Sequence, residues 1–454
     1  MPTQCNPEQL EFSCVERRRV VAAFDGGQVC SDGGALLLKQ TDEVIGLIDR
    51  LAGCFIDGRQ AGSVEHSVRA LLAQRIFGLA LGYEDLNDHD TLRSDPVFGV
   101  LVGKLEEPLA GKSTLNRLEL FAPRGVSRYH RIRPDAEAIE WLFVELFLDS
   151  YRTPPAQIVL DLDATDVPLH GEQERRFFHG YYDHYCYLPL YIFCGRQPLL
   201  ARLRPADIDG AAGAREAVAM LVEQIRCRWP QTRIVLRADS GFAREALMGW
   251  CEAHGVDYLF GLARNGRLVR AIGRELREAA AEARRTGRAA RRFRELTYRT
   301  RSSWSRTRRV VAKAEQTGDK ANPRFVVTSL AARDWPARAL YEELYCARGE
   351  MENRIKEAQL ELFADRLSAH AFRVNQLRLW LATFAHVLIE ALRRLALGGS
   401  ELARATAQTI RLKLLKIGAV VTLSVRRVRL ALSESCPHQA EFIAAWRALG
   451  AAAR

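Results

Sequence analysis

The sequence lacks the features that would mark a secreted, membrane-bound or zinc-stabilised protein. Its ten cysteines stand singly and form no Cys-x-x-Cys pair, which argues against a zinc finger or ribbon. The first twenty residues contain no apolar core of the length that a signal peptide needs. The most apolar stretch, residues 379–392, carries His386 and Glu390, so we expect a buried helix there and no membrane span. Internal repeats and low-complexity linkers are also missing, and we expect a globular cytoplasmic protein that binds no membrane.

Positive charge is abundant and unevenly placed. The net charge is +11, and the segment from Arg264 to Arg309 alone holds sixteen arginines against four glutamates. Such a concentration indicates a polyanionic partner, most simply nucleic acid. Residues 277–295 also contain good helix formers and charge pairs, so a solvated helix face is the alternative. The arginines that we expect to contact DNA phosphates are Arg284, Arg285, Arg288, Arg291 and Arg292.

The 454 residues are enough for several domains, and the patterns change along the chain. Residues 1–150 predict a mostly helical N-terminal domain that binds DNA. Two prolines at 154 and 155 mark a boundary. Strands that alternate with helices over residues 151–398 predict an α/β domain with a mixed sheet covered by helices. A basic, partly strand-like subdomain at 264–330 is predicted to interrupt it, and 399–454 is predicted to be a basic C-terminal tail with a helix and a hairpin.

Three acidic residues carry the chemistry that this sequence suggests. Asp163 lies near the end of an apolar run, IVLDLDATD, and Asp239 ends another, within RIVLRADSGF. Alternation along each strand places Asp161 and Asp163 on one face of the first strand, and Arg237 and Asp239 on one face of the second. If the two strands are neighbours, Asp163 and Asp239 face one pocket. A single aspartate at a strand end is more simply explained as a cap of the following turn.

The third acidic residue, Glu352, lies in YCARGEMENRIKE, which predicts a helix. Tyr345, Arg348, Glu352 and Lys356 are spaced by three, four and four residues, so they share one helical face. Glu352 can reach a metal from that face while Arg348 and Lys356 hold nearby phosphates. The alternative is an exposed face of salt bridges. Two aspartates at strand ends and one helical glutamate are the oxygen ligands that a two-metal phosphoryl-transfer site requires.

Several longer strings of the sequence point to a known family. They are LDLDATDVPLHGEQE, FFHGYYDHYCYLPLYIFCG, RADSGF, YCARGEMENRIKE, GYEDLNDHDTLRSDP and TIRLKLLKIGA. With these strings the chain resembles, over nearly its whole length, the DDE transposases of bacterial insertion sequences, in particular the insertion-sequence family numbered thirteen-eighty. The resemblance implies an RNase H-like catalytic core with a β-rich insertion before the last acidic residue.

The resemblance also implies an activity, a cofactor and partners. The activity is cutting and joining of double-stranded DNA at the terminal inverted repeats of the element and at target DNA. The cofactor is a pair of Mg²⁺ ions, for which Mn²⁺ can substitute, held by Asp163, Asp239 and Glu352. A homodimer in the synaptic complex and a location at the bacterial nucleoid are implied as well. The family usually has a lysine seven residues beyond the glutamate, whereas this chain has Gln359 there and its nearest lysine is Lys356.

Two other functions compete with this interpretation. The string DLDAT matches the Asp-x-Asp-x-Thr nucleophile motif of haloacid-dehalogenase-like phosphatases, in which Asp161 would be the nucleophile and Asp163 the general acid. RADSGFARE does not supply the later acidic motif of that family, and the basic segment has no role in it. A transposase-derived DNA-binding protein without catalysis is the third candidate, although the intact triplet argues against it.

Overall fold

The computed structural model of the chain describes residues 9–121 and 129–453. The chain forms two compact units. One comprises Met1–Arg133 together with Leu388–Arg454, and the other comprises Pro134–Val387. Parts of the predicted N-terminal domain and C-terminal tail, at 1–8, 122–128 and 454, lie outside the described residues.

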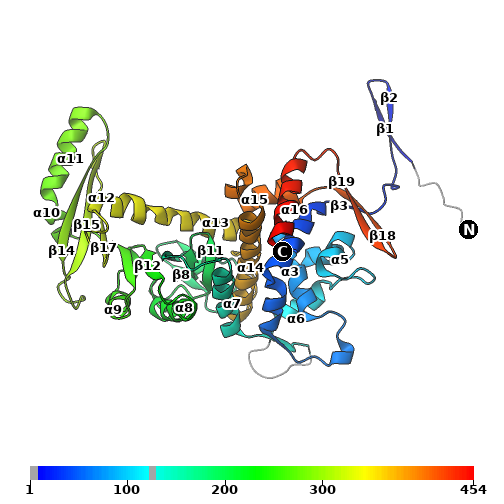
Figure 1. Ribbon diagram of the computed structural model, residues 1–454, viewed down its shortest axis with the longest axis horizontal. Coiled ribbons are helices and arrows are strands. Elements are labelled where there is room, and N and C mark those ends of the chain that lie inside the picture. The colour runs from blue at the N-terminus through cyan, green and yellow to red at the C-terminus, as the bar shows by residue number, and fades with distance from the viewer. Residues whose placement is uncertain (1–8, 122–128, 454) are drawn as a thin grey trace, which may run out of the picture. The chain divides into compact units, whose positions relative to one another are not determined.

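The first unit is mostly helical, as predicted for the N-terminal part of the chain (Figure 1). Its main elements are β1 (Leu10–Val15), β2 (Arg18–Ala22), β3 (Val29–Cys30), α1 (Leu36–Ile45), α2 (Leu47–Gly53), β4 (Phe55–Asp57), α3 (Val68–Leu81), α4 (His89–Leu92), α5 (Pro96–Val102), α6 (Lys112–Glu119), β5 (Ile132–Pro134), α15 (Ala407–Ile410), β18 (Ala419–Ser424), β19 (Arg427–Leu432) and α16 (Gln439–Ala452). The predicted hairpin near the C-terminus is confirmed as β18 and β19.

Residues 399–454 do not stand apart from the N-terminal helices. Strand β18 pairs antiparallel with β3, with Ala419 opposite Cys30, and Arg411 Nε donates to the carbonyl of Ala80 at 2.9 Å. These hydrogen bonds join the C-terminal segment to the N-terminal one, and the two segments belong to one compact unit. The predicted limits at 150, 398 and 399 therefore differ from the limits of the compact units, and as limits of functional domains they stay a prediction.

Local sequence signals set both ends of α3 in this unit. The Ser67 hydroxyl accepts from the Ala70 amide at 3.2 Å and caps the N-terminus. Gly82 ends the helix in the left-handed conformation, at φ 96°, which glycine adopts without a steric cost. Between them, the polar side chains of Gln74 and Arg75 are buried along with the apolar ones, so both need partners inside the unit.

The second unit contains a nine-stranded mixed sheet, which confirms the predicted α/β class. Eight strands follow the order β11-β10-β6-β12-β13-β17-β15-β14, and β16 pairs with β15. The elements of this unit are α7 (Ala136–Asp149), β6 (Gln157–Ala164), β7 (Val167–Pro168), β8 (Phe177–His179), β9 (His184–Tyr187), β10 (Leu190–Cys194), β11 (Gln197–Arg202), α8 (Ala214–Arg228), β12 (Arg233–Ala238), α9 (Glu245–Ala253), β13 (Asp257–Leu262), α10 (Gly266–Ala271), α11 (Gly273–Thr286), β14 (Ala290–Tyr298), β15 (Arg308–Thr317), β16 (Lys320–Ala321), β17 (Arg324–Thr328), α12 (Ala337–Ala339), α13 (Gly349–Leu362) and α14 (Phe372–Ala396).

The two faces of the sheet are covered by different helices, because alternate side chains of each strand point in opposite directions. Ile158, Leu160 and Leu162 of β6 belong to the core shared with α7, α8 and α9. On the other face, Tyr191 and Phe193 of β10 belong to the core shared with α13 and α14. Figure 1 shows α8 and α9 on one side of the strands and α13 on the other. The even-numbered residues of β6 thus face the first core, and Asp161 and Asp163 face the side of α13.

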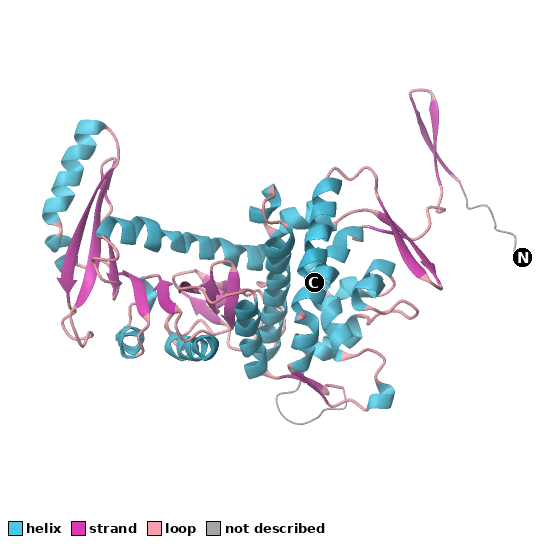
Figure 2. Ribbon diagram, viewed as in Figure 1, coloured by secondary structure: helices cyan, strands magenta, loops and turns pink. Residues whose placement is uncertain are grey.

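The basic segment 264–330 continues the main sheet. Its strands β14, β15 and β17 add to β13, with Leu259 of β13 opposite Thr328 of β17. The helical alternative for 277–295 holds only in part, because α11 ends at Thr286, Gly287 takes the left-handed conformation, and β14 begins at Ala290. Figure 2 shows the long strands of this segment beside α11. The segment is therefore bonded into the sheet that carries the acidic residues.

Among the described residues, no helix combines the length and the apolar character needed to cross a membrane. The apolar run at 379–392 lies inside α14 and is buried, as predicted.

Candidate active site

The sheet brings Asp163 and Asp239 to the same edge. Strands β6 and β12 are parallel neighbours, with Asp161 opposite Arg237 and Leu162 opposite Ala238. The next residues, Asp163 on β6 and Asp239 directly after β12, therefore come to the carboxyl end of both strands together. The condition set from the sequence, that the two strands are neighbours, is therefore met.

Backbone amides hold both aspartates in place. Asp163 Oδ1 accepts from the Ala164 amide at 3.1 Å. Asp239 caps the short helical turn at 240–242, where its Oδ1 accepts from the Gly241 amide at 2.8 Å. The turn-capping role considered for a lone aspartate thus applies to Asp239, and it fixes the carboxylate without removing it from the pocket, which Asp239 lines.

Glu352 approaches from the helix above this edge, and Arg348 lies between it and Asp163. Glu352 sits in the first turn of α13. Arg348 Nη2 donates to Glu352 Oε1 at 2.6 Å, and Arg348 Nη1 lies 3.9 Å from Asp163 Oδ2. The structure thus brings together the three predicted acidic residues, with one guanidinium as their counter-ion.

The electrostatics of the site reflect this crowding. Burial raises the pKa of Asp163 to about 6, Arg348 opposes that shift, and the carboxylates of Asp239 and Glu352 add to it. Burial works against the charge of Arg348, yet Asp163 and Glu352 raise its pKa above the ordinary value. The carboxylates of Asp239 and Glu352 therefore repel that of Asp163, and the Arg348 guanidinium offsets part of this repulsion.

The donor set suits a hard divalent cation, since all three side chains offer carboxylate oxygens. Within the described ranges, however, no three or more Asp, Glu, His or Cys side chains are close enough to hold a metal ion. In this arrangement the Glu352 carboxylate accepts a hydrogen bond from the Arg348 guanidinium. The three residues fit a metal in chemistry, and binding by all of them requires their carboxylates to come closer together than they lie here.

A buried ion pair beneath the site links the elements that carry the triplet. Arg237 donates from Nε and Nη2 to both oxygens of Asp161, at 2.5 and 2.7 Å. Its Nη1 donates at 2.5 Å to the carbonyl of Leu344, in the π-helical segment η5 (Leu340–Tyr345) that precedes α13. One side chain thus bridges β6, β12 and the helical segment that leads to Glu352. The sequence indicated that Asp161 shares a strand face with Asp163 and Arg237 one with Asp239, but not that Asp161 and Arg237 pair.

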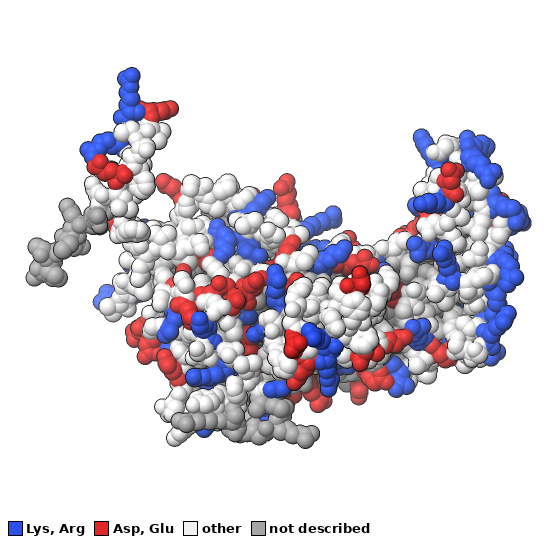
Figure 3. Space-filling view, turned by 180° about the vertical axis from the view of Figure 1, so that it is seen from behind, with Lys and Arg blue, Asp and Glu red and all other residues white. Residues whose placement is uncertain are grey.

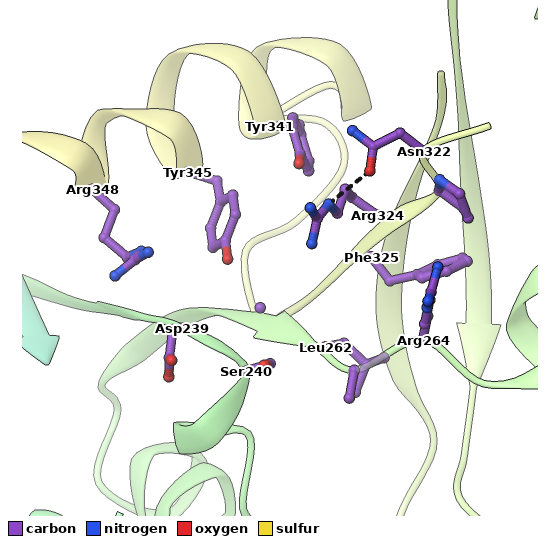
Figure 4. Close-up of a pocket in the computed structure, with 13 residues that line it drawn as sticks. Asp239, Ser240, Leu262, Arg264, Asn322, Arg324, Phe325, Tyr341, Tyr345 and Arg348 are labelled. Atoms are coloured by element: carbon purple, nitrogen blue, oxygen red, sulfur yellow. Dashed lines mark hydrogen bonds between the residues drawn. The ribbon is translucent and has the colours of Figure 1, made fainter. Parts of the chain in front are cut away.

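A cavity of about 570 Å³ opens beside Asp239. Figure 4 shows Tyr341, Tyr345 and Arg348 reaching from the helical segment toward the strand end that carries Asp239. Lining residues that sequence reasoning missed are Arg264, Asn322, Arg324 and Phe325. Their signal was weak, because they lie far from the triplet in the chain and the sheet brings them close.

Gly261 shows how tightly the elements approach one another at this cavity. A Cβ atom at Gly261 would lie 2.6 Å from Tyr345 Oη and 2.8 Å from the Ser240 amide nitrogen. Real Cβ atoms do not come so close, so glycine is needed at this position of β13.

Gln359, at the position where the resemblance implied a lysine, makes a hydrogen bond within the unit. Gln359 Nε2 donates to the carbonyl of Asp166 at 3.3 Å, and so ties α13 to the loop after β6. Lys356 is exposed one turn beyond Glu352, and it makes no ion pair with any described residue. Its predicted contact with DNA stays a prediction.

The five arginines predicted to bind phosphate fall into two groups. Arg291 pairs with Glu315 at 2.5 Å and with Glu342 at 3.3 Å, and Arg292 pairs with Glu282 at 2.5 Å. The other three, Arg284, Arg285 and Arg288, are exposed at the end of α11 and make no ion pair within the described part of the chain. Figure 3 shows Lys and Arg side chains gathered over this end of the unit. The structure thus leaves three of the five available to a polyanion.

Comparison with known proteins shows the family of the chain. The family model described as "Transposase DDE domain group 1" matches residues 12–453. No curated protein matches the chain. Among solved structures, the chain is similar to one in a cryo-EM structure of the piggyBac transposase synaptic complex with hairpin DNA. That match has 12% sequence identity and a TM-score of 0.41, and it covers 85% of this chain and 80% of the other.

Proposed function

Because the chain belongs to the transposase DDE domain group 1 family, we propose that it cuts and joins DNA at the ends of an insertion sequence. We further propose that its mixed sheet is an RNase H-like core and that its insertion-sequence family is the one numbered thirteen-eighty. The observation that carries the activity is the gathering of Asp163, Asp239 and Glu352 around Arg348 at the carboxyl ends of two parallel strands.

We infer that these three carboxylates hold two Mg²⁺ ions, for which Mn²⁺ can substitute. Bound there, such ions activate an attacking hydroxyl and stabilise the leaving oxygen of an in-line phosphoryl transfer. The chain itself fixes Asp163 and Asp239 through backbone amides and aims Glu352 from the first turn of α13. Arg348 balances the carboxylates in the DNA-free protein, and it moves to a DNA phosphate when the site is loaded.

The phosphate backbone is held by cationic and hydrogen-bonding groups around the cavity. Arg264 and Arg324 line it together with Arg348 and Tyr345. Guanidinium groups bind phosphate oxygens in a bidentate manner, which fixes the strand as well as attracting it. Further exposed cations are found at the end of α11 and at Lys356.

The partners follow from the activity. We propose double-stranded DNA as the substrate, both as the terminal inverted repeats of the element and as the target. Joining two ends requires two active sites, so we propose a homodimer in the synaptic complex, in the bacterial cytoplasm at the nucleoid.

The phosphatase alternative needs Asp161 as a free nucleophile. Both oxygens of Asp161 accept from Arg237, and the side chain is buried. That arrangement supports a positioning role for Asp161 and gives it no open face for attack on a phosphate.

The test compares two aspartates on one strand with a substrate made from the DNA that flanks the gene. Asp163→Asn is expected to abolish Mg²⁺-dependent cleavage of the element-end duplex while gel-shift binding is retained, and Asp161→Asn is expected to keep measurable cleavage. Full cleavage by Asp163→Asn with none by Asp161→Asn, or a trapped aspartyl-phosphate, would replace the proposal with the phosphatase one. A wild-type protein that binds element ends but never cuts them would be a DNA-binding derivative without catalysis.

A further inference from the structure

A run of aromatic residues lies beside the site without a role in the chemistry described so far. In FFHGYYDHY, from Phe177 to Tyr185, seven of nine residues carry a ring. Strands β8 and β9 pair antiparallel in a small sheet with β7, and Phe178 stands opposite Tyr185. We call residues 177–185 the aromatic hairpin.

The aromatic hairpin exposes rings that a folded chain usually buries. Tyr181 is 85% exposed at the turn, and Phe177, Phe178 and Tyr185 are 45%, 46% and 44% exposed. Phe178 and Tyr185 share one face of the strand pair, and their rings meet edge to face with centroids 5.5 Å apart. Exposed apolar side chains are common singly, but adjoining ones indicate a surface that binds something. Tyr181 and Tyr182 also meet edge to face, with ring centroids 5.0 Å apart.

The aromatic hairpin is anchored at the strand end that carries Asp163. Tyr182 and Ala164, the residue after Asp163, pack against the same small core of Cys186, Leu188 and Ala206. His184 Nε2 lies 2.8 Å from Asp166 Oδ2, in the loop that follows β6. Burial, and after it the carboxylates of Asp166 and Asp163, raise the pKa of Tyr182 to about 12, which agrees with this closeness. The aromatic hairpin therefore lies next to any ligand that is bound at Asp163.

The chemistry of the surface selects among possible ligands. Aromatic rings bind the flat faces of nucleobases by stacking, and those faces are available only where the bases are unpaired. A paired duplex presents phosphates and base edges, which suit arginines better than phenyl rings. Cations flank the rings as well, with the Arg176 guanidinium 4.8 Å from the centroid of the Tyr185 ring. An unpaired strand, with its bases and phosphates, matches both features.

We propose that the aromatic hairpin is a stacking platform for unpaired nucleotides of the DNA strand whose scissile phosphate lies at Asp163. This inference rests on the proposed function, because it takes DNA as the ligand of the neighbouring site. It goes beyond that function in giving the aromatic hairpin a separate role. The hairpin discriminates opened DNA from paired DNA, and so favours ends that are frayed or already nicked.

The experiment measures the affinity of the full chain for two probes that differ in one feature. Both are duplexes of the DNA that flanks the gene, one blunt and one with a short unpaired tail that carries 2-aminopurine. The wild-type protein is expected to bind the tailed probe more tightly and to change the fluorescence of the 2-aminopurine. Phe178→Ala combined with Tyr185→Ala should lower the affinity for the tailed probe by at least about fivefold and leave the blunt probe unchanged.

Two controls separate stacking from other effects. Tyr185→Phe retains the ring and should retain the preference for the tail. Trp141→Ala removes an exposed ring of 41% exposure on α7, away from the hairpin, and should change neither probe. Equal losses on both probes, or no loss on either, would overturn the platform. A changed self-association in place of a changed tail preference would also overturn it, and would assign the rings to a protein interface.

The inference and the proposed function fail in different ways. If the wild-type protein binds neither probe, the proposed function itself is wrong. If it cleaves element ends and binds blunt and tailed probes equally well, only the stacking platform is wrong.

Discussion

Arg348 donates a 2.6 Å hydrogen bond to Glu352, one helical turn further along, and thereby occupies the carboxylate that a metal ion would need. The same guanidinium lies 3.9 Å from Asp163. In the DNA-free protein, a side-chain cation therefore stands where the proposed function places divalent ions. Arg348 is thus a counter-ion of the Glu352 and Asp163 carboxylates.

This relationship predicts that Arg348 competes with metal. Arg348→Gln should raise the affinity of the DNA-free protein for Mn²⁺ by about tenfold, or roughly 1.4 kcal/mol, measured by titration calorimetry. Arg354→Gln is the matched control, because Arg354 lies on the same helix but pairs with Glu350 and Glu357. An Mn²⁺ affinity that is unchanged or weaker in Arg348→Gln would show that the arginine does not guard the carboxylates.

A second prediction concerns the buried pair of Arg237 and Asp161. Arg237→Met leaves the Asp161 carboxylate buried without a partner, which should cost roughly 3–5 kcal/mol of stability. Arg237→Met with Asp161→Leu should recover most of that stability but not DNA cleavage, because the bond to the Leu344 carbonyl stays lost. Chemical unfolding and cleavage assays on the same samples separate the two effects.

The control for that prediction lies on the same strand. Arg233 pairs with Asp257 at 2.7 Å, but its side chain is 42% exposed. Arg233→Met should cost no more than about 1 kcal/mol, the usual contribution of an exposed pair. If the double variant at positions 237 and 161 cleaves DNA as well as the wild type, the pair has no positioning role.

The arginines of the basic segment should contribute unequally to DNA binding. Each phosphate contact lowers the slope of log affinity against log salt by about 0.9. Gln substitutions at Arg284, Arg285 and Arg288 should make the slope shallower by up to about 2.7, the contribution of three contacts. Gln substitutions at Arg291 and Arg292 should change it little, since these two are already paired with glutamates. Equal changes from the two sets would mean that DNA displaces the glutamates.

Stability should fall on mild acidification through His89 in the helical unit. This side chain is fully buried, with Gln74 Nε2 3.1 Å from its Nδ1 and Arg75 Nη1 3.4 Å from its Nε2. Burial, and then the charge of Arg75, lower its pKa to about 3, although Asp85 and Asp90 oppose the shift. The unfolded chain takes up a proton near pH 6.5 and the folded one does not, so stability is lost as the pH falls below 6.5.

The expected slope is about 1.4 kcal/mol per pH unit between the two pKa values. Chemical unfolding should show that the free energy of unfolding of the wild type falls between pH 7 and pH 5. In His89→Gln the fall over the same interval should be smaller by roughly 2 kcal/mol. The same pH dependence in both proteins would mean that other groups cause the loss.

The sequence alone determined the elements of this protein that depend on local pattern. Apolar alternation gave the strands at 157–164 and 233–238, and helical spacing put Arg348 and Glu352 on one face. These features are local, because neighbouring side chains and backbone angles decide them. The three acidic residues were found in the same way, as carboxylates at strand ends and on a helix.

Tertiary structure decided which of these residues meet. The register of β6 against β12 placed Asp161 opposite Arg237, and the buried pair formed there satisfies two charges that neither strand can satisfy alone. Strand β17 of the basic segment pairs antiparallel with β13. The backbone hydrogen bonds of this pair make the predicted insertion a continuation of the main sheet. Likewise, nothing in the local sequence distinguishes Arg284, which has no acidic partner among the described residues, from Arg291, which has Glu315. Contacts between residues far apart in the chain decide which charges are paired and which polar groups find hydrogen-bond partners. The local sequence pattern does not contain this information.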